Sequence, residues 1–191
     1  MTKERMEAFS DGVLAVIITI MVLDMKPPHE TRLAAMRPLL PVFLSYVLSF
    51  IYVGIYWNNH HHLLHAAEQV SGGALWANLH VLFWLSLIPF TTAWVGENHV
   101  KAWPVALYGI VLLCAAIAYY ILTRVLIHLH GQGSTLAKSV GEDKKGKISI
   151  AVYAAAVPLA FVQPWIATAG YVIVAVMWLI PDRRIEREIA E

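Results

Sequence analysis

Histidines and asparagines gather in one short segment, and they are the first residues of the sequence that could do chemistry. The segment runs from Trp57 to His62 and ends in three consecutive histidines. His61 and His65 are four residues apart, so on a helix they share a face and could both ligate a metal ion. A secondary transporter or divalent-metal exporter built on His60–His65 would need further ligands, preferably carboxylates, and the nearest in sequence is Glu68.

Hydrogen bonding between helices accounts for the same residues with fewer requirements. An unpaired polar atom is costly in apolar surroundings, and asparagine and histidine side chains commonly join neighbouring helices there. The sequence therefore favours an interhelical polar network without a bound metal ion, made by Asn58, His61, His62, His65, Asn78 and His80.

A second polar group lies near the amino terminus, directly before an apolar run. Arg5 and Phe9 are four residues apart and share a helix face. Ser10 and Asp11 fall in the first turns, where the helix dipole favours a carboxylate. From spacing alone, these residues predict a helix cap and a local ion pair.

Catalytic motifs are missing. The chain has no Gly-x-Ser-x-Gly elbow, no His-Glu-x-x-His pair and no glycine loop that would hold a phosphate. The serines of the central region, such as Ser45 and Ser49, lie in apolar segments and are better suited to bonds across helices. We expect a protein that is not an enzyme and needs no cofactor.

The elements that position these residues follow from composition. Of the 191 residues, 59% are hydrophobic and 14% charged, whereas a soluble domain has roughly 45–50% and about 25%. A net charge of +1 argues against binding to nucleic acid, and the single cysteine, Cys114, excludes a disulfide framework. The composition predicts an all-α integral membrane protein that forms one domain over residues 1–191.

Six apolar segments predict six transmembrane helices. Three of them meet the length of about 20 residues that a span needs, and two shorter ones are separated by a break at Gln163-Pro164. The first segment is short and bounded by aspartates, so we expect an inner helix that other protein shields from lipid. In chain order the segments cover about Gly12–Leu23, Pro38–Trp57, Ala74–Val95, Trp103–Leu129, Ile148–Gln163 and Trp165–Ile180.

The basic residues predict the orientation. With the amino terminus in the cytoplasm, ten of the fourteen lysines and arginines fall on the cytoplasmic side, in accord with the positive-inside rule. The four on the outside are Lys26, Arg32, Arg37 and Lys101. An even number of spans then places both termini in the cytoplasm.

The segment from Arg5 to Leu23 resembles the first helix of the endosomal and lysosomal potassium channel family, transmembrane protein 175. The hallmark of that helix is Arg-x-x-x-Phe-Ser-Asp, and Arg5, Phe9, Ser10 and Asp11 match it in full. Six spans in one chain also resemble the bacterial members, so the resemblance covers essentially the whole length.

The resemblance implies a potassium-selective, passive cation channel in a bacterial plasma membrane. It implies a homotetramer whose first helices line a central pore, with membrane lipid and permeant potassium or other monovalent cations as its only further partners. The hydrophobic constriction falls at Val16, the pore face continues through Thr19 and Leu23, and the motif holds the helix in place. The family usually has isoleucine or leucine at the constriction, so valine implies a wider pore and modest selectivity.

Overall fold

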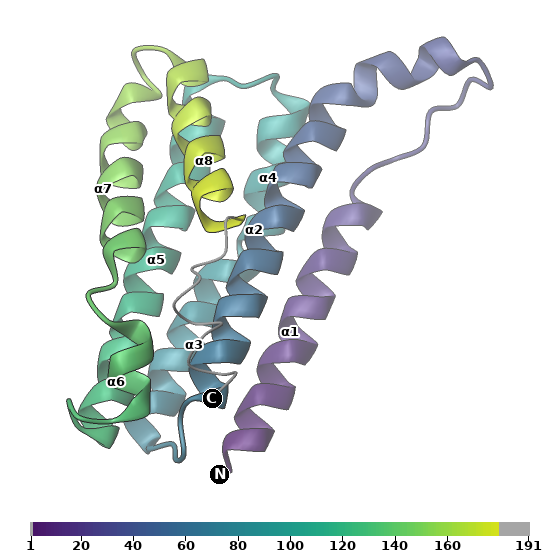
Figure 1. Ribbon diagram of the computed structural model, residues 1–191. Coiled ribbons are helices and arrows are strands. Elements are labelled where there is room, and N and C mark those ends of the chain that lie inside the picture. Colours follow the sequence, from purple (N-terminus) through teal and green to yellow (C-terminus); the bar gives the residue numbers. More distant parts are fainter. Residues whose placement is uncertain (1, 180–191) are drawn as a thin grey trace.

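The computed structural model describes residues 2–179, and every regular element within them is helical (Figure 1). The all-α prediction is confirmed for this part of the chain. Ile180, the predicted end of the sixth span, and the carboxy terminus lie outside the described residues. The elements are α1 (Lys3–Leu23), η1 (Leu33–Leu39), α2 (Leu40–His65), α3 (Gly72–Ser86), α4 (Ile88–Glu97), α5 (Ala102–His130), α6 (Thr135–Val140), α7 (Lys144–Leu159) and α8 (Pro164–Leu179).

Four stretches of helix are long and apolar enough to cross a membrane: α1, η1 with α2, α3 with α4, and α5. α7 overlaps the fifth predicted span, Ile148–Gln163, but begins and ends earlier and has 16 residues. α8 follows the sixth predicted span from Pro164 to Leu179, where the described residues end. α2 extends past its predicted end at Trp57 to His65 because no glycine or proline interrupts it there. The histidine segment is therefore part of a helix.

The third stretch is interrupted at one residue. α3 ends at Ser86 and α4 begins at Ile88, with Pro89 in the first turn of α4. Proline is tolerated in a first turn because the missing N–H has no helical partner there. Thr92 Oγ1 donates to the carbonyl of Ile88 at 2.7 Å, so the interruption leaves this hydroxyl satisfied within the helix.

The longest helix, α5, lies at the centre and separates two buried clusters. One cluster joins α1, α3 and α5 through side chains such as Leu14, Leu82 and Leu122. The other gathers tyrosines from α2, α5, α7 and α8, where the Tyr153 hydroxyl donates to that of Tyr52 at 3.2 Å. In both clusters the helices pack closely, and buried hydroxyl groups find hydrogen-bond partners, as helices inside a membrane require.

α1 lies along one edge of the bundle, with its amino terminus at the same end as α6 (Figure 1). At the other end an extended segment leads from α1 to η1, which projects away from the remaining helices. α1 packs against α2, α3 and α4, and within residues 2–179 its opposite side is exposed.

Close packing at Gly109 gives a test of the fold. A Cβ at this position would overlap the hydroxyl group of Tyr171, which donates to the carbonyl of Val105 at 3.1 Å. We expect Gly109→Ala to lower the free energy of unfolding by about 1–3 kcal/mol, measured as a lower melting temperature in detergent. Gly54→Ala is the control, because a Cβ there meets nothing within 4 Å. Equal melting temperatures for the two variants would contradict the packing of α8 on α5.

Candidate functional site

One face of α1 is fixed against the bundle. Its members are at most 3% exposed and recur every three or four residues, as one side of a helix requires. They are Met6, Ser10, Leu14, Ile17 and Met21. Four of the five are apolar and Ser10 is the exception. The hydrogen bonds of Ser10 are therefore the polar contacts that fix this face of α1 against the bundle.

Ser10 begins a chain of hydrogen bonds that joins three helices. His60 Nε2 on α2 donates to Asn78 Oδ1 on α3 at 2.7 Å, and Asn78 Nδ2 donates to Ser10 Oγ at 2.9 Å. Ser10 Oγ then donates to the carbonyl of Met6 at 2.8 Å. The three side chains are at most 3% exposed, so breaking any bond would leave a buried polar group without a partner. We call His60, Asn78 and Ser10 the buried relay.

The flank of α1 that faces α2 carries two carboxylates. Trp57 Nε1 donates to Asp11 Oδ1, and His61 Nδ1 donates to Glu7 Oε1, both at 3.0 Å. The His61 ring is also stacked between the rings of Trp57 and His65, one turn away on either side. α2 thus holds the first three turns of α1 from the side.

The amino-terminal end of α1 has one further anchor. Lys3 Nζ donates to the carbonyl of Ala67, just beyond the end of α2, at 2.9 Å. This bond, the buried relay and the two carboxylate contacts all lie within the first three turns of α1. The later turns are held mainly by apolar packing, with one weak contact from Thr92 Oγ1 on α4 to Met21 Sδ at 4.0 Å.

The predicted pore residues lie on the exposed side of α1. Val16 is 55% exposed and Leu23 78%, and Thr19 between them is exposed as well. The same stripe continues toward the amino terminus through Phe9 and Arg5. Thr19 Oγ1 donates to the carbonyl of Val16 at 2.9 Å, which leaves the hydroxyl oxygen as an acceptor on this face. We call Val16, Thr19 and Leu23 the exposed stripe.

Only some residues of the predicted interhelical polar network bond to another helix in the structure. Asn78 and His61 bond to other helices, and His65 contacts the His61 ring. His62 makes a ring contact with His61, and His80 accepts a bond from Trp84 on its own helix. Within residues 2–179, neither Asn58 nor Arg5 forms a side-chain hydrogen bond or ion pair.

Sequence reasoning missed three members of the site: His60, Glu7 and Trp57. A signal for His60 was available, because it shares a helix face with the apolar residues Val53 and Leu64. Glu7 and Trp57 gave no such signal, because their contacts depend on how α1 and α2 are rotated against each other. No group of three or more His, Cys, Asp or Glu side chains that could hold a metal ion occurs among the described residues.

The site residues on α1, α2 and α3 lie in a region that is similar to known proteins. Residues 5–89 match the family model for the endosomal/lysosomal potassium channel TMEM175. A potassium channel of a Chryseobacterium species is 53% identical over 191 residues and is covered, like this chain, in full. A potassium channel of Streptomyces collinus is 35% identical over an aligned length of 126 residues, and the match covers 60% of each chain.

A solved structure shows the same fold. It is the crystal structure of a lysosomal potassium-selective channel TMEM175 homolog from Chamaesiphon minutus, matched with a TM-score of 0.80. The match covers 93% of this chain and 96% of that one at 24% identity. The likeness therefore extends over α1 and the helices that hold it.

The buried relay predicts a cost for losing its central member. Asn78→Leu keeps the size of the side chain but leaves Ser10 without a donor and His60 without an acceptor. We expect the free energy of unfolding to fall by about 1–3 kcal/mol, measured by thermal denaturation in detergent. His80→Ala on the same helix is the control and should stay within about 0.5 kcal/mol of the wild type. Equal melting temperatures for Asn78→Leu and His80→Ala would show that the buried relay does not stabilise the fold.

Proposed function

The chain belongs to the TMEM175 potassium channel family, and we propose that it is a passive, modestly potassium-selective cation channel of a bacterial plasma membrane. The observation that carries this proposal is the division of α1 into two sides. One side is fixed to the bundle by the buried relay, and the other presents the exposed stripe. A helix held in this way can line a pore without being displaced into it.

We further propose that four copies assemble with their α1 helices around a central axis. In the described part of one chain the exposed stripe is not enclosed by other helices, so conduction along it requires that stripes from several copies face one another. In a bilayer, close packing of side chains between neighbouring copies favours such an assembly, and most homo-oligomers close with rotational symmetry. In this assembly residues 1–191 of each copy act as one unit of six spans, with α7 and α8 as the last two.

Val16 forms the constriction in this proposal. A ring of four valine side chains offers an ion no oxygen ligands, so the barrier depends on pore radius and on the cost of removing water. Potassium holds its water less tightly than sodium, so the barrier is lower for potassium. The Thr19 hydroxyl oxygens, one turn further along, replace part of the water that is lost. Valine is smaller than leucine or isoleucine, which limits the discrimination.

The orientation we propose places both termini in the cytoplasm. The amino terminus and α6 lie at one end of the bundle (Figure 1), and the segment around α6 carries Lys138, Lys144, Lys145 and Lys147. The amino terminus adds Lys3 and Arg5 to these four, whereas the opposite end, with η1 and the loop before α5, holds four basic residues in all: Lys26, Arg32, Arg37 and Lys101. This asymmetry supports a cytoplasmic amino-terminal end.

The alternative of a histidine-based metal exporter has no support in the described residues. His60 is engaged in the buried relay, and His61 bonds to Glu7. These histidines therefore help to hold α1 in place. Of the four motif residues, Ser10 and Asp11 set the position of the pore helix, while Arg5 and Phe9 lie on its exposed side.

Val16 provides the test of conduction. In bilayers with potassium on both sides and no second ion gradient, we expect the wild type to conduct under voltage alone. Val16→Ala and Val16→Asn should raise the current and lower the preference for potassium over sodium, because a smaller or polar ring reduces the cost of dehydration. Val22→Ala is the control, since Val22 is exposed but lies off the stripe. Unchanged current and selectivity in both Val16 variants would show that the constriction is elsewhere.

Asp11 separates a structural role from a role in attracting ions. If the carboxylate mainly holds α1 through Trp57, Asp11→Ala should lower the yield of tetramers and cost about 1–3 kcal/mol. Channels that still assemble should keep their selectivity. Asp24→Ala, at the other end of α1, is the control. Intact tetramers with a conductance loss that is strongest at low salt would instead show a pore-facing charge. Size-exclusion chromatography and single-channel recording distinguish the two results.

A further inference from the structure

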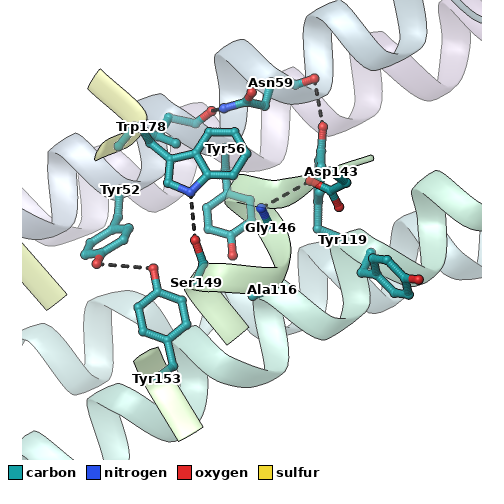
Figure 2. Close-up of a pocket in the computed structure, with 12 residues that line it drawn as sticks. Tyr52, Tyr56, Asn59, Ala116, Tyr119, Asp143, Gly146, Ser149, Tyr153 and Trp178 are labelled. Carbon is teal, nitrogen blue, oxygen red and sulfur yellow. Dashed lines mark hydrogen bonds between the residues drawn. The ribbon is translucent and has the colours of Figure 1, made fainter. Parts of the chain in front are cut away.

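A small cleft lies between α2, α5, α7 and α8, away from the exposed stripe (Figure 2). Its cavity volume is about 40 Å³, on a measure by which one water molecule needs roughly 10–15 Å³. The cleft therefore has room for a group of a few heavy atoms. Asp143, Asn59 and Tyr119 lie at one end and Tyr52, Tyr153 and Trp178 at the other (Figure 2).

The polar groups that line the cleft are acceptors with unused capacity. The Asp143 carboxylate accepts one hydrogen bond, from the Gly146 N–H at 3.1 Å, and forms no ion pair with a described residue. The amide oxygen of Asn59 and the hydroxyl of Tyr56 also have no hydrogen-bond partner within residues 2–179. No fully buried side-chain oxygen or nitrogen among the described residues lacks a partner, so these unpartnered groups are not fully buried, and all three residues line the cleft.

This arrangement suits a cation that donates hydrogen bonds. A carboxylate, an amide oxygen and a phenolic oxygen together match the three N–H donors of a primary ammonium group. The faces of the surrounding tyrosine and tryptophan rings attract positive charge as well. An anion would meet a carboxylate and gain little here.

Two basic side chains at the rim indicate the rest of the ligand. The Arg124 guanidinium lies 5.8 Å from the centre of the Tyr120 ring, and Lys145 Nζ lies 5.7 Å from that of Trp178. Both rings line the cleft. These cations would repel a simple amine, but they attract a zwitterionic head group, in which a phosphate accompanies the ammonium.

The short helix α7 brings such head groups near. Its 16 residues span about 24 Å, less than the roughly 30 Å of the hydrocarbon core. A bilayer adapts to short helices by thinning beside them, which moves its head groups toward the cleft. Burial raises the pKa of Asp143 above its ordinary value, opposed by the Gly146 N–H and by Lys147 and Arg124. An ammonium partner would offset that desolvation.

We propose that this cleft binds the head group of an ethanolamine phospholipid, with the ammonium at Asp143 and the phosphate toward Arg124. Binding of this lipid rests on the proposed insertion in a membrane but not on conduction. The lipid proposal can therefore be tested independently of the channel function. Binding would tie α7 to α2 and α5 at the end of the bundle that holds α6.

The test compares lipid retention by native mass spectrometry after reconstitution with equal amounts of ethanolamine and choline phospholipid. We expect the wild type to retain the ethanolamine lipid preferentially and Asp143→Asn to lose it roughly tenfold or more. Asparagine keeps a side-chain oxygen to cap α7 and tolerates the positive φ of 45° at this position. Glu142→Gln is the matched control, because this neighbouring carboxylate is 75% exposed.

Three results would overturn the proposal. The first is equal retention of ethanolamine lipid by Asp143→Asn and by the wild type. The second is equal retention of the choline lipid, which has no ammonium N–H, by the wild type. The third is complete displacement of the lipid by soluble glycerophosphoethanolamine, which would assign the cleft to a soluble ligand. If Asp143→Asn does not fold, Tyr56→Phe removes one acceptor while keeping the ring, and should still weaken retention several-fold.

Discussion

The hydrogen bonds from His60 through Asn78 to Ser10 are the constraint on which the rest of the arrangement depends. They are buried, they join three helices, and each has a single geometry that satisfies both partners. Because Ser10 must face Asn78, the rotation of α1 about its own axis is fixed. The opposite side of α1, with Val16, Thr19 and Leu23, is then directed away from the bundle without any contact of its own.

The four motif residues on α1 have different roles because their side chains point in different directions. Ser10 points into the bundle, Asp11 toward α2, and Arg5 and Phe9 to the exposed side. Ser10 and Asp11 therefore hold α1 from the bundle interior and from α2, and the third side of the helix stays exposed. The histidine segment completes this arrangement, because α2 continues far enough to place Trp57 and His61 beside Asp11 and Glu7.

Much of the fold could be predicted from the sequence, because apolar length alone marks α2, α3 with α4, and α5. Membership in the polar site was harder to predict. Asn78 was identified from its polarity in an apolar segment, but His60 and His61 are neighbours of the same type, and only packing shows that one is buried and the other reaches Glu7. The cleft at Asp143 was not predicted at all. It joins residues from four helices and depends on a helix cap in a loop that looks merely charged.

The central claim is that the exposed side of α1 lines the pore, and cysteine accessibility tests it most directly. In a Cys114→Ala background, single cysteines along residues 9–23 would be treated with a small, charged, thiol-reactive reagent during potassium recording. The account predicts block at positions 16, 19 and 23, which share the exposed stripe, and no effect at 14, 17 and 21, which face the bundle. Block at the bundle-facing positions, or none on the exposed stripe, would contradict it.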